Sequence, residues 1–332
     1  MRSISSKAVI FRDFGGPEVL ELVEVDVPPP GPGEIRVRIN AFALNRSEAM
    51  FRQGWHPIKP QFPSRIGYEA AGIVESAGEG AEFAPGDRVS TLPIMSLNAC
   101  GAYGEYFTIP AELAVRSPET LSDVETAALW SSYMTAYGML IELVKIERGD
   151  WVLVTAASSS LGAPIFQILA MLGANVIATT RTRGKAEAIA RMGASHVVVT
   201  EEENLAERVA SITMGKGVRF AFDPIGGPII GEIAELVCPY GTIVLYGILD
   251  FTPVNLPVMP LIGKNLSILG YAMLLDDQPE RNERAIAFIR EGVGKGALKP
   301  MVGKNFKLEN IKEAAQYFDN LQQTGKVVLV NS

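Results

Sequence analysis

A turn of small residues is the first place where this sequence could do chemistry. The stretch AASSSLG at residues 156–162 joins the apolar run WVLVT to a helical run that ends at Gly173. Such a turn directs backbone N–H groups and the positive end of a helix dipole toward a phosphate, and small side chains let the phosphate come close. Apart from Gly162, which packs the helix against the strand, other small residues stand where a G-x-G-x-x-G motif has glycines. The turn therefore predicts a pyrophosphate site, with an ordinary serine-rich helix cap as the alternative.

The segment TTRTRGK at residues 179–185 narrows the choice of nucleotide. NAD-binding folds carry an acidic residue here that holds the ribose 2′-hydroxyl, yet no carboxylate occurs before Glu187. Arg181, Arg183 and Lys185 instead offer the bidentate and point charges that bind a phosphate. A solvated basic helix start is the alternative, although cations at that end oppose the helix dipole. The segment therefore favours NADPH, whose 2′-phosphate suits these cations, over NADH.

Apolar strands that alternate with helices are needed to hold both segments in place. The predicted strands lie at residues 151–155, 175–179, 195–199, 219–223 and 242–247, with a sixth at 266–271. Strands of this kind, buried on both faces and joined by helices, form a parallel sheet. Two amphipathic helices, 279–291 and 308–322, and a closing strand, 326–330, complete the pattern. The expected fold class is α/β, with a doubly wound parallel sheet.

The first part of the chain has a different texture. Residues 7–89 alternate short β-rich runs with proline and glycine, which predicts a small, mostly β module. Longer helical segments begin after Pro118, and the first is predicted to span 123–144 with Ser122 or Asp123 as its N-cap. A domain boundary near residue 120 follows.

Length and composition limit the classes of protein. The chain has 332 residues, of which 48% are hydrophobic and 20% charged, so it can bury a full core. Its net charge of −7 provides no general basic field, and we expect no nucleic-acid or membrane partner. Glycine, proline and polar residues interrupt the most apolar stretch, 151–180, which argues against a membrane span. Two distant cysteines and an N-terminus without a secretory apolar run favour a cytoplasmic location.

Several longer motifs occur together along most of the chain. They are FGGPEVLEL (14–22), PGPGEIRVRINAFALNRSE (30–48), GYEAAGIVESAGEG (67–80), PGDRV (85–89), GAYGEYFTIP (101–110), YMTAYGML (133–140), GDWVLVTAASSSLG (149–162) and GKVVLV (325–330). With this combination the chain resembles the medium-chain dehydrogenase/reductase superfamily, and within it the zinc-free quinone oxidoreductase and enoyl reductase branch.

This resemblance implies two domains and NADPH as cofactor. A GroES-like, mostly β domain would be formed by residues 1–122 and 274–332, and a Rossmann domain by residues 123–273, with a cleft at their junction. It also implies a homodimer paired through the edge of the Rossmann sheet, around residues 242–271. Together with the basic segment, it gives these expected cofactor-binding residues: Asn45, Thr135, Ala157, Ser158, Ser159, Ser160, Leu161, Thr180, Arg181, Arg183, Lys185, Thr200, Tyr246, Gly247 and Ile248.

Zinc is not expected. Zinc-dependent relatives bind the metal with cysteine and histidine at three positions that correspond here to Asn45, Tyr68 and Ser131, and none of these is a soft or imidazole ligand. The four-cysteine lobe of those enzymes is also missing, because residues 91–110 contain Cys100 alone. Glu69 remains at a position that supports the metal site in relatives, and we interpret it as a structural carboxylate.

Chemistry without a metal requires an acceptor that delocalises charge. A hydroquinone anion or the enolate of an α,β-unsaturated carbonyl meets that requirement, since hydrogen-bond donors are enough to stabilise either one. The resemblance assigns Asn45 and Thr135 to catalysis. His56 is a candidate proton donor, with a rim histidine as the alternative.

Aromatic residues are candidates for the substrate cleft, although such residues are more often core packing. The candidates are Trp55, Tyr68, Tyr133 and Tyr137, and the loop 93–99 is a candidate cover. His196 opens an apolar strand and is interpreted as structural.

The expected activity is NADPH-dependent hydride transfer to a small-molecule quinone or enone. Three other interpretations stay open: an enoyl-thioester reductase of fatty-acid or polyketide synthesis, an alcohol dehydrogenase-like reductase, and a non-catalytic NADPH-binding protein. Turnover on a suitable acceptor separates the enzymes from the binding protein.

Overall fold

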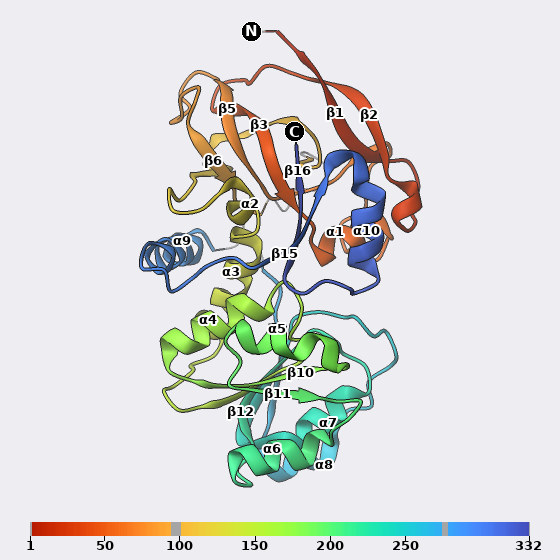
Figure 1. Cartoon of the computed structure of the whole chain (residues 1–332), viewed down its shortest axis with the longest axis vertical. Coiled ribbons are helices and arrows are strands. Elements are labelled where there is room, and N and C mark those ends of the chain that lie inside the picture. Colours follow the sequence, from red (N-terminus) through yellow and green to blue (C-terminus); the bar gives the residue numbers. More distant parts are fainter. Residues whose placement is uncertain (1, 94–100, 274–277, 332) are drawn as a thin grey trace. The chain divides into compact units, whose positions relative to one another are not determined.

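The computed structural model describes residues 2–93, 101–273 and 278–331 (Figure 1). Its contacts divide the chain into two units, Met1–Ser132 with Leu274–Ser332, here called the β-rich unit, and Tyr133–Met273, here called the α/β unit. The first boundary falls after Ser132, within helix α3 (Trp130–Tyr137), whereas the sequence places it at residue 122. The candidate cover loop at 93–99 lies almost entirely outside the described residues.

The α/β unit is built on one parallel, six-stranded sheet. Its strands follow the order β11 (His196–Val199), β10 (Asn175–Thr180), β9 (Trp151–Val154), β12 (Val218–Asp223), β13 (Val237–Leu245) and β14 (Ser267–Gly270). This is the 3-2-1-4-5-6 order of a doubly wound, dinucleotide-binding fold. The predicted fold class is therefore confirmed, although β13 begins earlier than the predicted 242, because the segment CPYG resembles a turn in the sequence.

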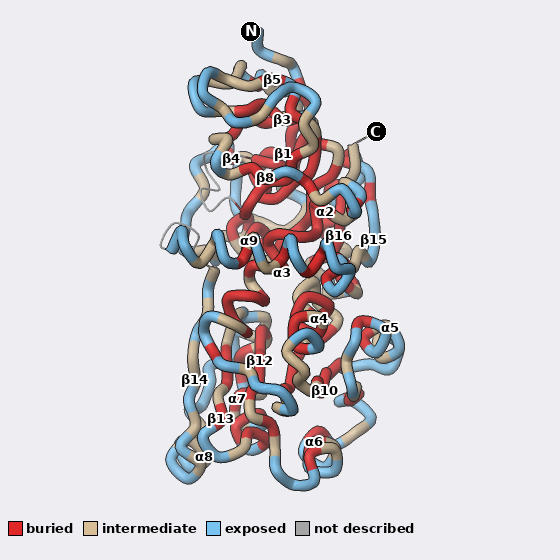
Figure 2. The backbone as a smooth tube through the Cα atoms, turned by 90° about the vertical axis from the view of Figure 1, so that its left-hand side faces the viewer, coloured by how far each residue is buried: buried red, intermediate tan, exposed pale blue. Residues whose placement is uncertain are grey.

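Helices cover both faces of this sheet. They are α4 (Gly162–Leu172), α5 (Ala186–Arg191), α6 (Leu205–Thr213), α7 (Ile229–Leu236) and α8 (Val258–Lys264), with a 3₁₀ turn, η4 (Arg183–Lys185), before α5. Right-handed crossovers place α4 and α5 on one face and α6 to α8 on the other. Val209 of α6 and Ile233 of α7 share one core with Leu153 of β9. Figure 2 shows that α4 and β12 are largely buried whereas α8 is largely exposed.

The turn between β9 and α4 has a backbone that few residues tolerate. Ala156 has a φ of 46°, in the left-handed region that glycine usually occupies. A Cβ on Gly162 would lie 2.0 Å from the Ala157 carbonyl oxygen, so only glycine fits at the start of α4. Gly173 ends the helix with a φ of 75°, as predicted. Gly162 is therefore required by the geometry of this turn.

The β-rich unit contains two sheets. The larger, seven-stranded sheet has the order β15 (Val302–Lys307), β16 (Lys326–Val330), β3 (Glu34–Ala43), β5 (Ala70–Ala77), β6 (Arg88–Thr91) and β8 (Ala114–Arg116), with β7 (Tyr106–Pro110) paired to β3. The smaller sheet has the order β2 (Glu21–Val27), β1 (Ile4–Phe11) and β4 (Ser64–Arg65). The two ends of the chain thus share one unit, because β16 pairs antiparallel with β3.

Short helices connect these strands. They are α1 (Arg46–Arg52), α2 (Asp123–Thr126), α9 (Pro279–Gly294) and α10 (Ile311–Asp319), with 3₁₀ turns η1 (Pro17–Val19), η2 (Ala111–Leu113) and η5 (Leu308–Asn310). Ser122 caps α2 through a capping box with Glu125, which confirms the first of the two predicted N-caps. The predicted helix 308–322 is shorter than expected, as it is α10 preceded by η5.

The single helix predicted at 123–144 is wrong. The structure divides it into α2, α3 and a π-helical segment, η3 (Gly138–Leu143). Between α2 and α3 the backbone hydrogen bonds change to the 3₁₀ pattern, in which an N–H donates to the carbonyl three residues earlier. The Ala128 N–H donates to the Glu125 carbonyl, and the Leu129 N–H donates to the Thr126 carbonyl. The apolar run AALW is continuous in the sequence and gives no sign of this break. No helix of the described residues is long and apolar enough to cross a bilayer.

The contact between Gly162 and Ala157 generates the first prediction. Gly162→Ala should lower the free energy of unfolding by about 1–3 kcal/mol, since the added methyl overlaps a fixed carbonyl. Urea denaturation measures this loss. Gly184→Ala is the matched control, because a Cβ at Gly184 meets nothing within 4 Å and its stability should be unchanged. Equal losses in both variants would contradict the prediction.

Candidate functional site

Polar side chains gather at the carboxyl edge of the parallel sheet in the α/β unit. Thr155 follows β9 and Asp223 ends β12, and the Thr155 hydroxyl donates to the buried Asp223 carboxylate. Thr200 extends this row, because its amide N–H donates to the Thr180 carbonyl at 2.9 Å. Tyr246 is tied to it as well, through its N–H and the Asp223 carbonyl at 3.0 Å. This edge is where doubly wound sheets bind their ligands.

The predicted phosphate turn carries polar atoms that lack partners. The Oγ of Ser159 and the hydroxyl of Tyr246 are both buried, and apart from their influence on each other they find no hydrogen-bond partner among the described residues. Burial also raises the pKa of Tyr246, which keeps its hydroxyl protonated. Buried hydroxyls of this kind normally have a partner. A bound group with phosphate or ribose oxygens would supply one, so the turn fits a dinucleotide.

The basic segment separates into two parts in the structure. The Lys185 Nζ lies 3.4 Å from the Ser158 hydroxyl, which places this cation at the phosphate turn. Burial and the charge of Arg181 lower the pKa of Lys185, as expected for two neighbouring cations. Arg183 is exposed instead, and its guanidinium pairs with the Glu202 carboxylate. Arg181 and Lys185 therefore form the cationic side of the turn.

Other predicted residues of the α/β unit are placed mainly by packing. The Tyr133 ring is fully buried and its hydroxyl donates to Gln167 of α4 at 2.7 Å, and Tyr137 is buried with its hydroxyl 2.9 Å from Glu142. The Thr135 Oγ1 lies 3.7 Å from the Met273 sulfur. Gly247 and Ile248 lie in the loop after β13, where a Cβ on Gly247 would approach Pro224 to 2.9 Å.

In the β-rich unit, Asn45 and Ser131, two of the three positions expected to correspond to zinc ligands of relatives, contact Glu69. Glu69 is 1% exposed. One of its oxygens accepts the Ser131 N–H at 2.8 Å, and the other lies 3.4 Å from the Asn45 amide nitrogen. Tyr68 precedes Glu69 directly, and its hydroxyl bonds to that of Ser47. Among the described residues no group of three histidine, cysteine or acidic side chains could hold a metal ion.

A lysine that sequence analysis did not single out lies at the centre of this cluster. Lys326 is 2% exposed, and its Nζ lies 2.6 Å from both the Glu69 carboxylate and the Asn45 side-chain oxygen. The Ser132 hydroxyl is a third acceptor, at 3.2 Å. A lysine inside the otherwise apolar strand KVVLV was the only sequence signal for this site.

Glu48 is a second residue that sequence analysis missed. Its carboxyl accepts the Asn45 N–H at 2.7 Å, the Tyr68 N–H at 2.8 Å and the Tyr103 hydroxyl at 2.5 Å. Burial outweighs these three donors and raises the pKa of Glu48 to about 7, with the Glu69 charge adding to the rise. The spacing of Asn45 and Glu48, an N-cap and the third helical residue, is a capping box that the sequence does contain.

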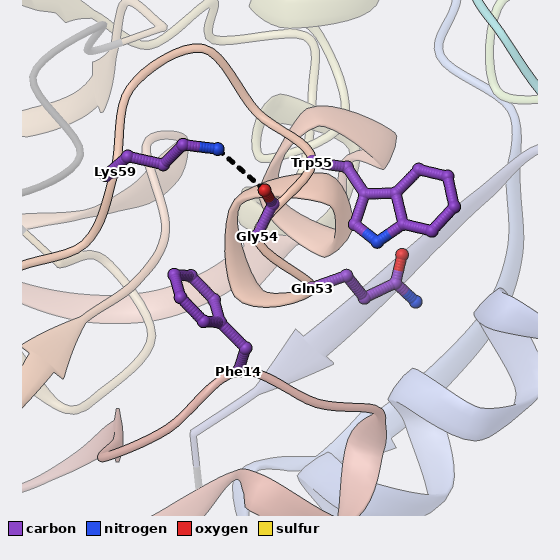
Figure 3. Close-up of a pocket in the computed structure, with 5 residues that line it drawn as sticks. All are labelled: Phe14, Gln53, Gly54, Trp55 and Lys59. Carbon is purple, nitrogen blue, oxygen red and sulfur yellow. Dashed lines mark hydrogen bonds between the residues drawn. The ribbon is translucent and has the colours of Figure 1, made fainter.

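His56 and Trp55 lie on the surface of the β-rich unit. The Nδ1 of His56 accepts the Ile58 N–H at 3.1 Å, so the neutral ring carries its proton on Nε2. Burial, rather than the weaker effect of Lys59, holds the pKa of His56 below its usual range. Trp55 is 54% exposed and lines a cavity of about 600 Å³ with Phe14, Gln53, Gly54 and Lys59 (Figure 3). Figure 3 shows Phe14 and Trp55 on opposite sides of Gly54.

The raised pKa of Glu48 generates the second prediction. Between pH 4.5 and about 7 the folded state keeps a proton that the unfolded state has released, so the free energy of unfolding falls as pH rises through this window. The fall is at most about 1.4 kcal/mol per pH unit. Tyr103→Phe removes a donor that lowers the pKa, and should extend the fall above pH 7.

Urea denaturation at a series of pH values measures this dependence. Glu48→Gln is the control, because it removes the titrating group and should abolish the slope in this window. A slope that ends at the same pH in wild type and Tyr103→Phe would show that Tyr103 does not set the pKa of Glu48.

Two family models match the chain. Residues 31–119 match the alcohol dehydrogenase GroES-like domain, and residues 160–291 match the zinc-binding dehydrogenase domain. A 2-haloacrylate reductase of Burkholderia sp. is 32% identical over 97% of this chain and 98% of its own length. The quinone oxidoreductase of Homo sapiens is 28% identical over 98% and 97%.

A solved structure has the same fold. The Escherichia coli quinone oxidoreductase complexed with NADPH matches with a TM-score of 0.88 and 28% identity, over 98% of this chain and 99% of its own. The chain belongs to the medium-chain dehydrogenase/reductase superfamily of oxidoreductases, in its zinc-free, quinone oxidoreductase-like branch.

Proposed function

We propose that this chain is an NADPH-dependent, zinc-independent oxidoreductase that transfers hydride to a quinone or to an α,β-unsaturated carbonyl. The observation that carries the proposal is the phosphate turn, where the Lys185 ammonium contacts the Ser158 hydroxyl and lies close to Arg181. Between the end of β10 and Glu187 the sequence contains no carboxylate. The names of the relatives agree with it, since one is a quinone oxidoreductase and another a 2-haloacrylate reductase.

The residues that would hold the cofactor belong to the carboxyl edge of the parallel sheet, apart from Asn45 and Thr135. The turn 157–161 would bind the pyrophosphate through its backbone and the start of α4, and Arg181 with Lys185 would bind the 2′-phosphate. Thr180, Thr200 and the segment 246–248 would line the same edge, and Thr135 of α3 would add a hydroxyl. NADPH supplies the hydride when it is bound.

The chain's own contribution to the reaction is electrostatic. Hydride addition leaves negative charge on the acceptor oxygen, and a fixed hydrogen-bond donor lowers the energy of that charge. We assign this role to the Asn45 amide, which is 6% exposed and held by charged neighbours. The Thr135 hydroxyl is the second donor in this proposal.

Protonation of carbon is needed only for the enone reaction, and we assign it to His56. Its pKa is lowered by burial, so the imidazole is mainly neutral at pH 7 and becomes an acid only as the pH falls. Enone reduction should therefore accelerate as the pH falls below the usual imidazole range. Trp55, which lines the cavity beside His56, is proposed to contact the apolar part of the acceptor.

We also propose that the enzyme works in the cytoplasm as a homodimer. The support for pairing is an exposed apolar face at the edge of the parallel sheet, on α8 and the loop before it. Its residues are Phe251, Val254, Leu256, Val258, Met259 and Ile262, of which Met259 is 81% exposed. Exposed apolar patches of this kind mark protein interfaces. Sedimentation velocity of the purified chain would report the mass of the pair.

The cofactor assignment generates the third prediction. Replacing Arg181 and Lys185 together with alanine should raise the KM for NADPH about tenfold or more, because each charge-assisted hydrogen bond to phosphate is lost. The KM for NADH should change little. Steady-state kinetics with both nucleotides measure the difference.

Arg183→Ala is the matched control for that variant. Its guanidinium is occupied by Glu202, so its effect on the KM for NADPH should be much smaller. Equal losses with NADPH and NADH in the double variant would refute the 2′-phosphate assignment.

The acceptor generates the fourth prediction. Purified enzyme given NADPH with an ortho-quinone and a medium-chain enone should form quinol, saturated ketone or both, as measured by chromatography of the products. His56→Phe should slow formation of the ketone more than that of the quinol, and should remove the acceleration at low pH. NADPH binding without either product would favour the non-catalytic alternative, and unchanged ketone formation would remove His56 from the mechanism.

A further inference from the structure

The buried ammonium of Lys326 contacts three oxygens within hydrogen-bond distance. An ammonium has three N–H groups, and the structure provides three acceptors, the Glu69 carboxylate, the Asn45 Oδ1 and the Ser132 Oγ. Two of these distances are 2.6 Å, which is short for an N–H···O bond and typical of charge-assisted contacts. Lys326 therefore acts on its neighbours and not on solvent, because it is 2% exposed.

The strand pairing of the chain's two ends creates this contact. In the antiparallel pair of β16 and β3, Val328 lies opposite Ala43, and the Leu44 N–H donates to the Val327 carbonyl at 3.0 Å. Continuing the register by one further step places Lys326 opposite Asn45. The contact is thus fixed by backbone hydrogen bonds and does not depend on a flexible surface side chain.

The ammonium determines which way the Asn45 amide faces. An amide has an acceptor oxygen and a donor nitrogen, and only the oxygen can face an ammonium, because the opposite orientation would bring two donors together. The Nδ2 group lies 3.4 Å from both the Glu69 carboxylate and the Ala43 carbonyl, which are long contacts for an amide donor. Its N–H groups are therefore only weakly occupied within the β-rich unit.

We propose that Lys326 and Glu69 form a positioning pair for Asn45. Glu69 holds the ammonium, the ammonium fixes the amide oxygen, and the amide nitrogen is left as a donor in one orientation. The positive charge on the oxygen side also polarises the amide and strengthens its N–H groups as donors. This inference rests on the proposed function, in which the Asn45 amide stabilises the charge that develops on the acceptor.

The test compares Lys326→Met/Glu69→Gln with Asn45→Ser. The double variant removes both buried charges together, which avoids the unpaired charge that either substitution alone would leave. Asn45→Ser keeps an N-cap residue for α1 but removes the amide. Thermal unfolding and circular dichroism select the variants that are folded.

The first readout needs neither cofactor nor substrate. In 15N NMR spectra of the cofactor-free protein, the Asn45 Nδ2 resonances are identified by their absence in Asn45→Ser. They should shift in Lys326→Met/Glu69→Gln and stay in place in Arg36→Met/Glu75→Gln. That control removes another ion pair with a buried arginine, at the opposite end of β3. Unchanged Asn45 resonances in the first variant would overturn the proposal, whether or not the proposed activity exists.

The second readout is a double-mutant cycle on kcat. We expect Lys326→Met/Glu69→Gln and Asn45→Ser each to lower kcat by about tenfold or more, as supporting shells of reactive groups do. Combining them should cost no more than Asn45→Ser alone, because the pair acts through the amide. Losses that multiply would assign Lys326 a role independent of Asn45 and overturn the proposal. Arg36→Met/Glu75→Gln should change kcat by less than about twofold.

Discussion

A buried ammonium must be met by oxygens, and Lys326 imposes this requirement on the β-rich unit. Removing such a charge from water costs several kcal/mol unless the surroundings replace its hydration. The three oxygens that do so come from separate segments: Glu69 before β5, Asn45 before α1 and Ser132 in α3. Because Lys326 opens β16, the pairing of β16 with β3 buries this ammonium and requires the three oxygens to be in position around it. One charge thus couples the last strand of the chain to the turn that carries Asn45.

The α/β unit meets a related requirement with backbone geometry in place of a charge. Its phosphate turn holds Ala156 in a left-handed conformation, which costs about 1 kcal/mol for a residue with a Cβ. Hydrogen bonds on both sides offset that cost, since the Ala157 N–H donates to the Thr179 carbonyl and the Thr155 hydroxyl donates to Asp223. In each unit, the polar atoms of the candidate site thus lie next to strands and helix starts. Such elements position side chains more rigidly than loops do.

The sequence predicts the fold well where local physics decides it. The strands of the parallel sheet are recognisable because burial on both faces requires nearly continuous apolar runs. Gly173 marks a helix end because it adopts the left-handed conformation, and Ser122 marks a helix start because its hydroxyl accepts a backbone N–H. It fails where a local pattern is ambiguous. The break between α2 and α3 lies in an apolar run that fits one long helix, and the start of β13 contains proline and glycine.

The site is harder to predict because its contacts join distant segments. The phosphate turn and the basic segment are each contiguous, so the sequence indicates both, but only the structure separates Lys185 at the turn from Arg183 paired with Glu202. The sequence indicates Glu69 only through the resemblance and Lys326 only as a lysine in an apolar strand, and their pairing depends on the register between β16 and β3. The contact between Glu48 and Asn45 is predictable from the sequence, since their spacing is that of a capping box.

Asn45 joins these features, and its side chain explains why an amide suits this position. Its backbone N–H donates to Glu48, whose charge depends on pH near 7, while its side-chain oxygen accepts from Lys326, whose charge is paired with Glu69. The sulfur of a cysteine here would accept a weaker hydrogen bond from the ammonium than the amide oxygen does. A histidine would accept through a ring nitrogen that competes for the proton of the ammonium. An amide accepts from the ammonium, and its two N–H groups make only long contacts with Glu69 and Ala43. The same residue type that binds zinc poorly is therefore well matched to a site whose positive charge is supplied by lysine.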